Sequence, residues 1–283
     1  MNNEDNTNYG IDVHLLCEFL QGQDRQGPGS VEMTLKALGF IEGLDERSQM
    51  VDIACGTGGQ TLTLARHTTG RITAIDNYPG FIDKLNREAD RLHLRDRVQG
   101  MVGTMEKLPF EAESLDLIWC EGAIYIIGFE RGIREWRPLL KEGGYLAISE
   151  CCWLTEERPK EIHDFWMEGC PEIDTIPVKV AQLQRAGYRL VATFVLPESC
   201  WTDNYYQPIA ARKEAFRAKH PGDRSVEMLL HFLEFETDMY RRYKDYYGYV
   251  FFIAKKREVS HFLCPNCRIC RISRDVACNV SII

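Results

Sequence analysis

Short apolar runs rich in β-branched residues alternate along the chain with segments of helical periodicity. This alternation is typical of a parallel sheet that carries helices on both faces. Seven of the runs have the length and composition of strands, and they are residues 50–54, 71–75, 97–102, 115–120, 145–149, 189–196 and 249–254. The pattern therefore predicts an α/β fold built on a seven-stranded, mostly parallel sheet.

Three segments between these runs have the features of helices. Residues 81–92 place apolar side chains on one helical face and charged side chains on the other, which predicts an amphipathic crossover helix. A second helix is expected over residues 132–141, where the two glycines that follow would close its carboxyl end. A third begins with Pro177 at a first-turn position and ends at Gly187, so that it leads directly into the sixth strand.

Two segments, residues 151–176 and 197–247, are longer than ordinary connections. They share a high content of aromatic residues, which are Trp153, Trp166, Trp201, Tyr205, Tyr206, Tyr240, Tyr243, Tyr246 and Tyr247. These side chains fit the core of additional helices, and they also fit a lid over a substrate pocket, because a lid must itself pack. We therefore expect one domain over residues 1–257, in which the two insertions form a helical lid.

The last part of the chain, residues 258–283, differs in composition from the rest. It holds four closely spaced cysteines, which are Cys264, Cys267, Cys270 and Cys278. Thiolates at such spacings could hold zinc or an iron–sulfur cluster. We favour the alternative of an unstructured extension and assign no metal site, because no second cysteine pair at domain-like spacing supports a zinc ribbon.

Charge and hydropathy narrow the range of partners. The chain has 34 Lys and Arg against 42 Asp and Glu, a formal charge of -8, so it has no excess of positive charge to neutralise the phosphates of a nucleic acid. No segment approaches 18 uninterrupted apolar residues, and the polar, acidic amino-terminal segment does not resemble a signal peptide. These features predict a cytoplasmic protein without a membrane partner, and they leave open whether it forms a homodimer.

Residues 51–61, VDIACGTGGQT, lead from the first strand into a helix through a glycine-rich turn, where the backbone can approach a ligand closely. Gly56 and Gly58 could instead simply relieve strain in a tight connection. Asp76 ends the second strand, where a carboxylate can accept hydrogen bonds from a ribose diol. A nicotinamide cofactor is the weaker candidate, because Thr61 stands where the fingerprint G-x-G-x-x-G requires its third glycine.

Four motifs in order resemble those of class I S-adenosylmethionine-dependent methyltransferases, of the small-molecule type that acts in ubiquinone and menaquinone biosynthesis. The motifs are VDIACGTGG, ITAIDNYPGFI, MEKLPFEAESLDLIWCEGAIYII and LKEGGYLAISE. The segments QGPGSVEMTLKALGFI and KDYYGYVFFIAKK also look like bacterial proteins that are described as methyltransferases. The resemblance implies a Rossmann-like fold, S-adenosylmethionine as cofactor and a small molecule as methyl acceptor.

The resemblance also implies which residues bind the cofactor. They are Gly29, Ser30, Asp52, Ala54, Cys55, Gly56, Gly58, Asp76, Asn77, Thr104, Met105 and Glu121. Asp52 and the loop at 54–58 would hold the methionine part of the cofactor. Asp76 would bind the ribose, and residues 77, 104 and 105 would line the adenine.

Two positions depart from the family pattern. Ala54 replaces a usual glycine, and Thr104 replaces a frequent aspartate. A methyl side chain is small and a hydroxyl can still accept one hydrogen bond, so neither departure prevents binding. Ser30, in the turn that carries Gly29, would either cap the following helix or, as the family implies, help to close over the cofactor.

The methyl group of a sulfonium is already activated, so an enzyme mainly has to align a nucleophile behind it, which can supply about 7 to 11 kcal/mol. An acceptor hydroxyl or ammonium would also need a base. Ligands of open α/β sheets bind beyond the carboxyl ends of the strands. Glu121 and Tyr125 at the end of the fourth strand are therefore the first catalytic candidates, and Glu150 at the end of the fifth is the third.

Simpler roles are open for the same residues. Glu121 could be a helix-starting carboxylate and Tyr125 a packed aromatic residue. Cys55 and Cys120 are expected to be small apolar fillers, because no basic residue is adjacent in sequence. The favoured function is methyl transfer to a small molecule, and the alternatives are a nicotinamide-dependent oxidoreductase and a non-catalytic protein that binds S-adenosylmethionine.

Overall fold

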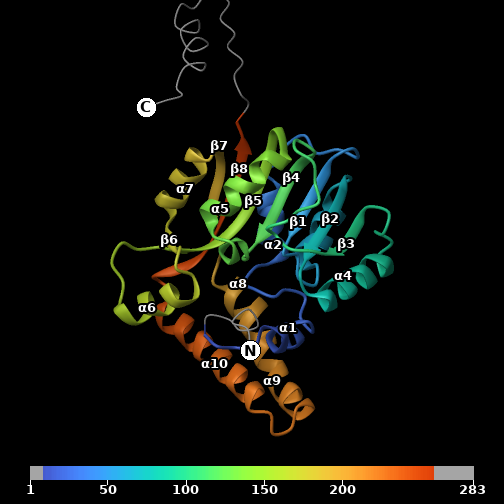
Figure 1. Cartoon of the computed structure of the whole chain (residues 1–283). Coiled ribbons are helices and arrows are strands. Elements are labelled where there is room, and N and C mark those ends of the chain that lie inside the picture. Colours follow the sequence, from blue (N-terminus) through green and yellow to red (C-terminus); the bar gives the residue numbers. More distant parts are fainter. Residues whose placement is uncertain (1–8, 258–283) are drawn as a thin grey trace, which may run out of the picture.

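The computed structural model describes residues 9–257, which form a central sheet with helices around it (Figure 1). The main strands are β1 (Gln49–Ile53), β2 (Arg71–Asp76), β3 (Val98–Val102), β4 (Leu115–Glu121), β5 (Leu140–Trp153), β7 (Tyr188–Val195) and β8 (Tyr247–Lys256). Their order is β3-β2-β1-β4-β5-β8-β7, and β8 runs antiparallel to both neighbours. All seven predicted strands and the mostly parallel Rossmann-like sheet are confirmed. A two-residue strand, β6 (Asp174–Thr175), also pairs with β5 and is too short to leave a periodic signal.

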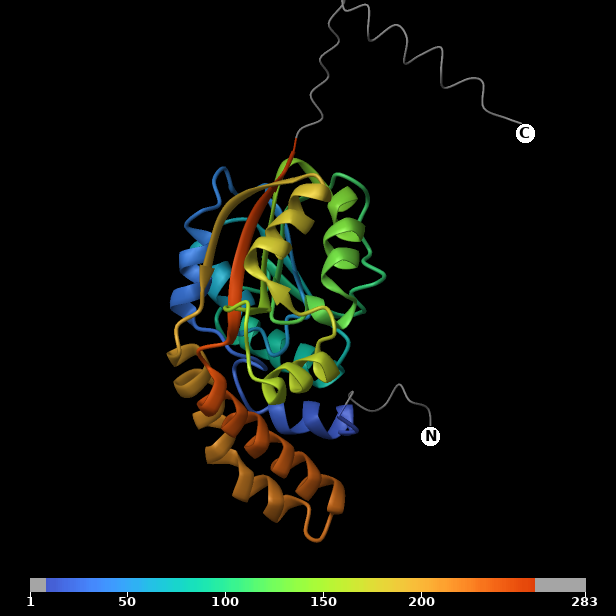
Figure 2. The same ribbon diagram turned by 90° about the vertical axis from the view of Figure 1, so that its left-hand side faces the viewer.

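Helices cover both faces of the sheet, as Figure 2 shows from the side. One layer contains α2 (Val31–Leu38), α3 (Gly59–His67) and α4 (Pro79–Arg91), and the other contains α5 (Phe129–Trp136) and α7 (Ile176–Arg185). Successive side chains of a strand point to opposite faces. Met50 of β1 accordingly packs into the core under the first layer, while Val51 and Ile53 pack into the core under the second.

The predicted crossover helix at 81–92 and the helix that begins near Pro177 are confirmed as α4 and α7. The helix expected over residues 132–141 is wrong at its carboxyl end. It stops at Trp136 and is followed by a short 3-10 turn, Arg137–Leu139, after which β5 begins at Leu140. Pro138 is the physical reason, because proline has no backbone N–H to donate to the carbonyl four residues earlier and its ring crowds that carbonyl.

The long insertions form helices that gather at the carboxyl ends of the parallel strands, below the sheet in Figure 1. The elements there are α1 (Val13–Leu20), α6 (Lys160–Gly169), α8 (Ser199–Trp201), a π-helical turn (Thr202–Tyr206), α9 (Gln207–Lys219) and α10 (Arg224–Tyr243). Their core is aromatic, as expected. The rings of Trp201 and Tyr240 stack at 4.5 Å, and Tyr206 and Tyr247 are buried beside them. The first insertion begins later than predicted, because β5 continues to Trp153.

Within residues 9–257, no helix is both long enough and apolar enough to cross a membrane. The four cysteines at positions 264 to 278 lie outside the described residues, as does the predicted unstructured extension to which they belong. The described cysteines, all of which precede residue 201, are free thiols.

Candidate active site

The loop between β1 and α3 contains the glycine-rich turn and has an unusual backbone. Gly58 has a φ of +89°, a left-handed conformation that favours glycine, and it caps the amino terminus of α3. A β-carbon on Gly56 would lie 1.9 Å from Oε1 of Gln26, and one on Gly58 would lie 2.2 Å from Cδ1 of Leu85. The side chains of Gln26 and Leu85 therefore pack closely against the glycine-rich loop. The glycines are needed for packing as well as for any ligand.

Asp52 supports this loop from below. Its side chain is fully buried, and its carboxylate accepts hydrogen bonds from Oγ1 of Thr61 at 2.5 Å and from Nε2 of Gln60 at 3.5 Å. Burial raises the pKa of Asp52 to about 8, an effect that the hydrogen bond from Thr61 opposes and the charge of Glu121 increases. Asp52 thus ties the start of α3 to β1 and offers no exposed carboxylate to a ligand.

Asp76 joins the loops that follow β1 and β2. One oxygen of its carboxylate accepts the backbone N–H of Gly56 at 2.9 Å, and the other accepts that of Tyr78 at 3.0 Å. Burial raises the pKa of Asp76 above its usual range, and these hydrogen bonds oppose the rise. Since each carboxylate oxygen can accept more than one hydrogen bond, both oxygens retain capacity for the hydroxyl groups of a ribose.

The end of β3 lies beside Asp76, because the backbone N–H of Gly103 donates to the carbonyl of Asp76 at 2.9 Å. Asn77 and Thr104 are exposed near this junction, whereas Met105 is buried and its carbonyl accepts the indole N–H of Trp136 at 3.0 Å. The structure therefore brings the proposed ribose and adenine residues together at the carboxyl ends of β2 and β3.

Glu121, at the end of β4, forms a compact polar network. Its Oε2 accepts from Arg25 at 2.6 Å, and its Oε1 accepts from Oγ1 of Thr34 at 2.7 Å and from the indole N–H of Trp119 at 2.9 Å. The side chains of Arg25 and Glu121 are only 11% and 5% exposed. Both oxygens of Glu121 are therefore occupied, which suits an orienting role better than that of a proton acceptor.

Sequence reasoning missed Arg25, Gln26 and Thr34. Gln26 accepts the backbone N–H of Thr57 at 2.9 Å, so the segment before α2 lies on the glycine-rich loop. Ser30 caps α2, as predicted, by accepting the backbone N–H of Met33 at 3.1 Å. The proline- and glycine-containing turn before α2 was the only signal for this segment. Nothing in the sequence paired Arg25 with Glu121 across 96 residues.

The other two catalytic candidates differ in accessibility. Tyr125 lies in the 3-10 turn Ile124–Ile126 after β4 and is 41% exposed. Glu150 is fully buried in β5, with Oε1 at 4.0 Å from Nζ of Lys179. Burial raises the pKa of Glu150 to about 7, and the charge of Lys179 opposes the rise. Electrostatic interaction links the Tyr125 hydroxyl to Glu150, so these residues share one region of the site.

Cys55 and Cys120 are buried, and burial raises the pKa of both thiols well above the ordinary value. Thiols of this kind are weak nucleophiles, which agrees with the expectation that these residues fill space.

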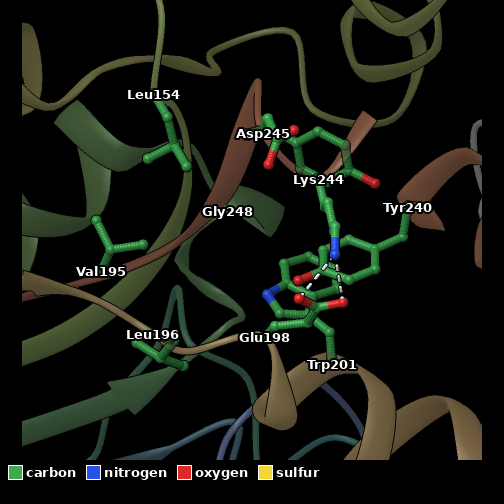
Figure 3. Close-up of a pocket in the computed structure, with 10 residues that line it drawn as sticks. Leu154, Val195, Leu196, Glu198, Trp201, Tyr240, Lys244, Asp245 and Gly248 are labelled. Atoms are coloured by element: carbon green, nitrogen blue, oxygen red, sulfur yellow. Dashed lines mark hydrogen bonds and ion pairs between the residues drawn. The ribbon is translucent and has the colours of Figure 1, made fainter. Parts of the chain in front are cut away.

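A cavity of about 140 Å³ lies away from these residues, between the end of β7, α8 and the carboxyl end of α10 (Figure 3). An ion pair between Lys244 and Glu198, at 2.7 Å, crosses it, and Trp201 and Tyr240 form one wall. Small-molecule sites usually have volumes of about 300 to 1,000 Å³. This cavity is too small for a cofactor, and none of the predicted site residues lines it.

Residues 50–144 match a family model described as a methyltransferase domain. This part of the chain is a methyltransferase domain. It contains β1 to β4 and with them the glycine-rich loop, Asp52, Asp76 and Glu121. The family expected from the four sequence motifs is confirmed over this range.

Solved structures extend the comparison to nearly the whole fold. An S-adenosylmethionine-dependent methyltransferase from Geobacter sulfurreducens, in complex with S-adenosylhomocysteine, is similar with a TM-score of 0.76 and 20% identity, over 87% of this chain and 99% of that chain. The cyclase SpnF is similar with a TM-score of 0.70 and 19% identity, over 89% of this chain and 97% of that chain. The chain therefore has the class I methyltransferase fold, which SpnF shares.

Relatives found by sequence similarity match a smaller part of this chain. The sterol 24-C-methyltransferase of Kluyveromyces lactis is 24% identical over 182 residues, which are 61% of this chain and 48% of that protein. The chain thus spans about half the length of this relative. A methyltransferase-like protein of Schizosaccharomyces pombe is 28% identical over 114 residues, 40% of this chain and 41% of that protein.

Proposed function

We propose that this chain transfers a methyl group from S-adenosylmethionine to a small-molecule acceptor. The observation that carries the proposal is the position of Asp76. Its carboxylate ends β2 within the methyltransferase domain and lies against the glycine-rich loop, where it can accept hydrogen bonds from a ribose. The Geobacter relative, of the same fold, is in complex with S-adenosylhomocysteine.

The cofactor would lie across the carboxyl ends of β1 to β4. Asp76 would bind the ribose, with Asn77, Thr104 and Met105 around the adenine. The loop at 54–58 would hold the methionine part, and Asp52 would keep that loop in shape from below. The segment that carries Gly29 and Ser30 would cover the cofactor, because Gln26 already fixes this segment to the loop.

The reaction needs alignment more than proton transfer. When bound, S-adenosylmethionine would supply an activated methyl group, which a lone pair of the acceptor would displace while the electrons of the carbon–sulfur bond stay on sulfur. The proton of an acceptor N–H or O–H would pass to a base or to solvent. Glu121, held by Arg25 and Thr34, would orient the reactants at the end of β4. Tyr125 would contact the acceptor, and Glu150 would act as a buried carboxylate behind it. The helices of the two insertions would exclude water as a lid.

A different activity on the same fold is the second candidate, since the similar structure SpnF is described as a cyclase. Production of S-adenosylhomocysteine separates the two, because only methyl transfer consumes the cofactor. The nicotinamide-dependent oxidoreductase is a further alternative, and a titration with NAD tests it.

Titration calorimetry with S-adenosylmethionine, S-adenosylhomocysteine and NAD tests the proposal. We expect the first two to bind and NAD not to bind. Asp76→Ala removes hydrogen bonds to a charged acceptor, each worth about 1.5 to 3 kcal/mol, so its affinity for S-adenosylhomocysteine should fall at least about tenfold. Asp83→Ala, on the exposed face of α4, is the matched control and should bind like the wild type. Equal affinity of the two variants would show that the ribose assignment is wrong.

The partners follow from the surface charge and the fold. We infer that the protein does not act on nucleic acid, on the basis of its formal charge of -8. We propose a cytoplasmic location as a separate point. Cell fractionation tests the location, and light scattering tests whether the protein is a homodimer.

A further inference from the structure

Four tyrosines and one glutamate meet between the end of β4 and α10, and we call them the tyrosine–glutamate cluster. Its members are Tyr125, Tyr205, Tyr206, Tyr249 and Glu236. The hydroxyl of Tyr206 donates to Oε1 of Glu236 at 3.2 Å, and the rings of Tyr205 and Tyr206 are 5.2 Å apart. Electrostatic interactions link Tyr125 and Tyr205 to Glu236, and Tyr249 to both of those tyrosines. Four segments distant in sequence thus supply one cluster.

The cluster reaches the proposed site of methyl transfer. A β-carbon on Gly122 would lie 2.9 Å from Cε2 of Tyr249 and 3.3 Å from its hydroxyl, so the Tyr249 ring lies directly against the residue after Glu121. Tyr125 follows β4 as well and is 41% exposed. A molecule held by the cluster would therefore lie beside the end of β4, where the methyl donor is expected.

Glu236 is the carboxyl group of the cluster. Among residues 9–257, Glu236 forms no ion pair. Its hydrogen bond comes from a neutral tyrosine. Burial raises the pKa of Glu236 to about 7, which the hydrogen bond from Tyr206 opposes, yet its side chain retains some exposed surface. A carboxylate in this environment is stabilised by a positive charge that arrives from outside.

The basic side chain that faces Glu150 is already engaged. Lys179 is fully buried, lies 4.0 Å from Glu150 and donates to the carbonyl of Glu172 at 2.7 Å. Electrostatic interactions connect Glu150 with Tyr125 and Tyr249, which adds a second carboxyl group behind the cluster. The groups that these contacts place around the cluster are carboxyl groups and tyrosine rings, which favour a cationic acceptor over an anionic one.

We propose that the tyrosine–glutamate cluster binds the acceptor through a positively charged amino group, which Glu236 neutralises and the tyrosine rings surround. Cations are attracted to the faces of aromatic rings, and a carboxylate among such rings adds a direct ion pair. The acceptor class is thus a molecule that carries an amino group. If that nitrogen is the methylated atom, it must first give one proton to the Glu236 carboxylate, because an ammonium has no lone pair with which to attack the methyl carbon. This inference rests on the proposed function, because the bound amine is a methyl acceptor only if the protein transfers a methyl group.

Three probes that differ mainly in charge test the inference, namely benzylamine, benzyl alcohol and benzoate. Binding is measured by protein-observed NMR in the millimolar range, with and without S-adenosylhomocysteine. We expect benzylamine to bind at least about tenfold more tightly than the other two. Equal binding of benzylamine and benzyl alcohol, preference for benzoate, or no binding of any probe would overturn the proposal.

Variants locate the binding. Glu236→Gln should weaken benzylamine binding about tenfold or more and leave the affinity for S-adenosylhomocysteine unchanged. Glu234→Gln, on the exposed face of the same helix, is the matched control. Tyr206→Phe keeps the ring and removes only the hydroxyl, so it should bind benzylamine and supplies a second test if Glu236→Gln does not fold. Unchanged benzylamine affinity in Glu236→Gln, or loss of the amine preference in Glu234→Gln, would show that the cluster is not the site.

The two proposals fail differently. Absence of S-adenosylhomocysteine binding in the wild type contradicts the proposed function, whereas the amine titration without the cofactor still decides whether the cluster selects cations.

Discussion

Ala54 has a φ of +54°, in the left-handed region that glycine adopts with little cost. It stands in the glycine-rich loop at the position where the methyltransferase motif usually has glycine. A side chain in this conformation costs about 1 kcal/mol or more. The departure seen in the sequence is therefore also a source of backbone strain.

Ala54→Gly should raise the free energy of unfolding by about 1 kcal/mol, since glycine removes the strain. Urea denaturation measures the change. Ala210→Gly, on the exposed face of α9, is the control and should lower the free energy of unfolding by about 1 kcal/mol. A loss of stability in both variants would mean that the loop at Ala54 is not strained.

Asp52 should make stability depend on pH. Its pKa is about 8 in the folded protein because of burial, against about 3.9 for an unperturbed aspartate. Between these values the folded state binds more protons than the unfolded state, so the free energy of unfolding should fall as pH rises, by up to about 1.4 kcal/mol per unit. The raised pKa values of Glu150 and Glu236, about 7 each, act in the same direction.

Asp52→Asn should flatten this dependence between about pH 5 and 8 without abolishing it, because the two glutamates remain. Urea denaturation at several pH values measures the slope. Asp116→Asn, which changes an exposed ion pair with Lys141, should leave the slope as in the wild type. If the slope of stability against pH is unchanged in Asp52→Asn, groups other than Asp52 cause the pH dependence.

Elements that are distant in sequence are joined by the ion pair of Arg25 and Glu121. The pair attaches the segment before α2 to the end of β4 and is almost fully buried. Loss of one partner leaves the other charge unpaired, which costs about 3 to 5 kcal/mol in a buried pair. The pair should therefore be coupled strongly.

A double-mutant cycle of Arg25→Met and Glu121→Gln should show a coupling above about 1 kcal/mol, as measured by urea denaturation. The exposed pair of Arg131 and Glu135 on α5 is the control, with an expected coupling of about 0.3 to 0.5 kcal/mol. If Glu121 also orients the reactants, Glu121→Gln should lower turnover about 100-fold while cofactor affinity stays within a few fold. Additive stabilities in the Arg25 and Glu121 cycle would contradict the proposed coupling.

The helices α4 and α7 show where the local sequence pattern is sufficient to predict an element. The amphipathic spacing at 81–92 predicted α4, and Pro177 with Gly187 bracketed α7, because these signals act within a few residues. The error at residues 132–141 arose from weighting the glycines at 143 and 144 above Pro138. The proline acts earlier in the chain and ends the helix first.

At the scale of the molecule, the proposed lid would depend on aromatic packing between the insertions and the sheet. Trp201 contacts Tyr240 of α10 and Tyr247 of β8, so it joins three elements. Once an acceptor is identified, Trp201→Ala should raise its KM and leave cofactor affinity nearly unchanged, with a stability loss of about 3 to 5 kcal/mol.

Leu183→Ala, buried in α7 on the other side of the sheet, is the matched control for this loss of packing. It should lower stability by about 2 to 5 kcal/mol and leave KM unchanged. A KM that rises equally in both variants would mean that general destabilisation, and not the lid, governs acceptor binding.

The sequence by itself determined the strands, the helices α4 and α7, and the positions of the glycine-rich loop and Asp76. Each depends on backbone preferences and on side-chain periodicity over a few residues. Motif order was enough to indicate the methyltransferase family, and a model of a methyltransferase domain matches residues 50–144. The roles of individual site residues stay predictions.

Only the tertiary structure decided what surrounds those residues. It paired Glu121 with Arg25, placed Asp52 beneath the loop, and brought Tyr125, Tyr205 and Glu236 into one cluster. These contacts join segments from about ten to more than a hundred residues apart, and they depend on how helices pack on the sheet after the chain has closed long loops. Periodicity carries no information about such partners, because it reports which face of an element is buried and not which side chain meets it there.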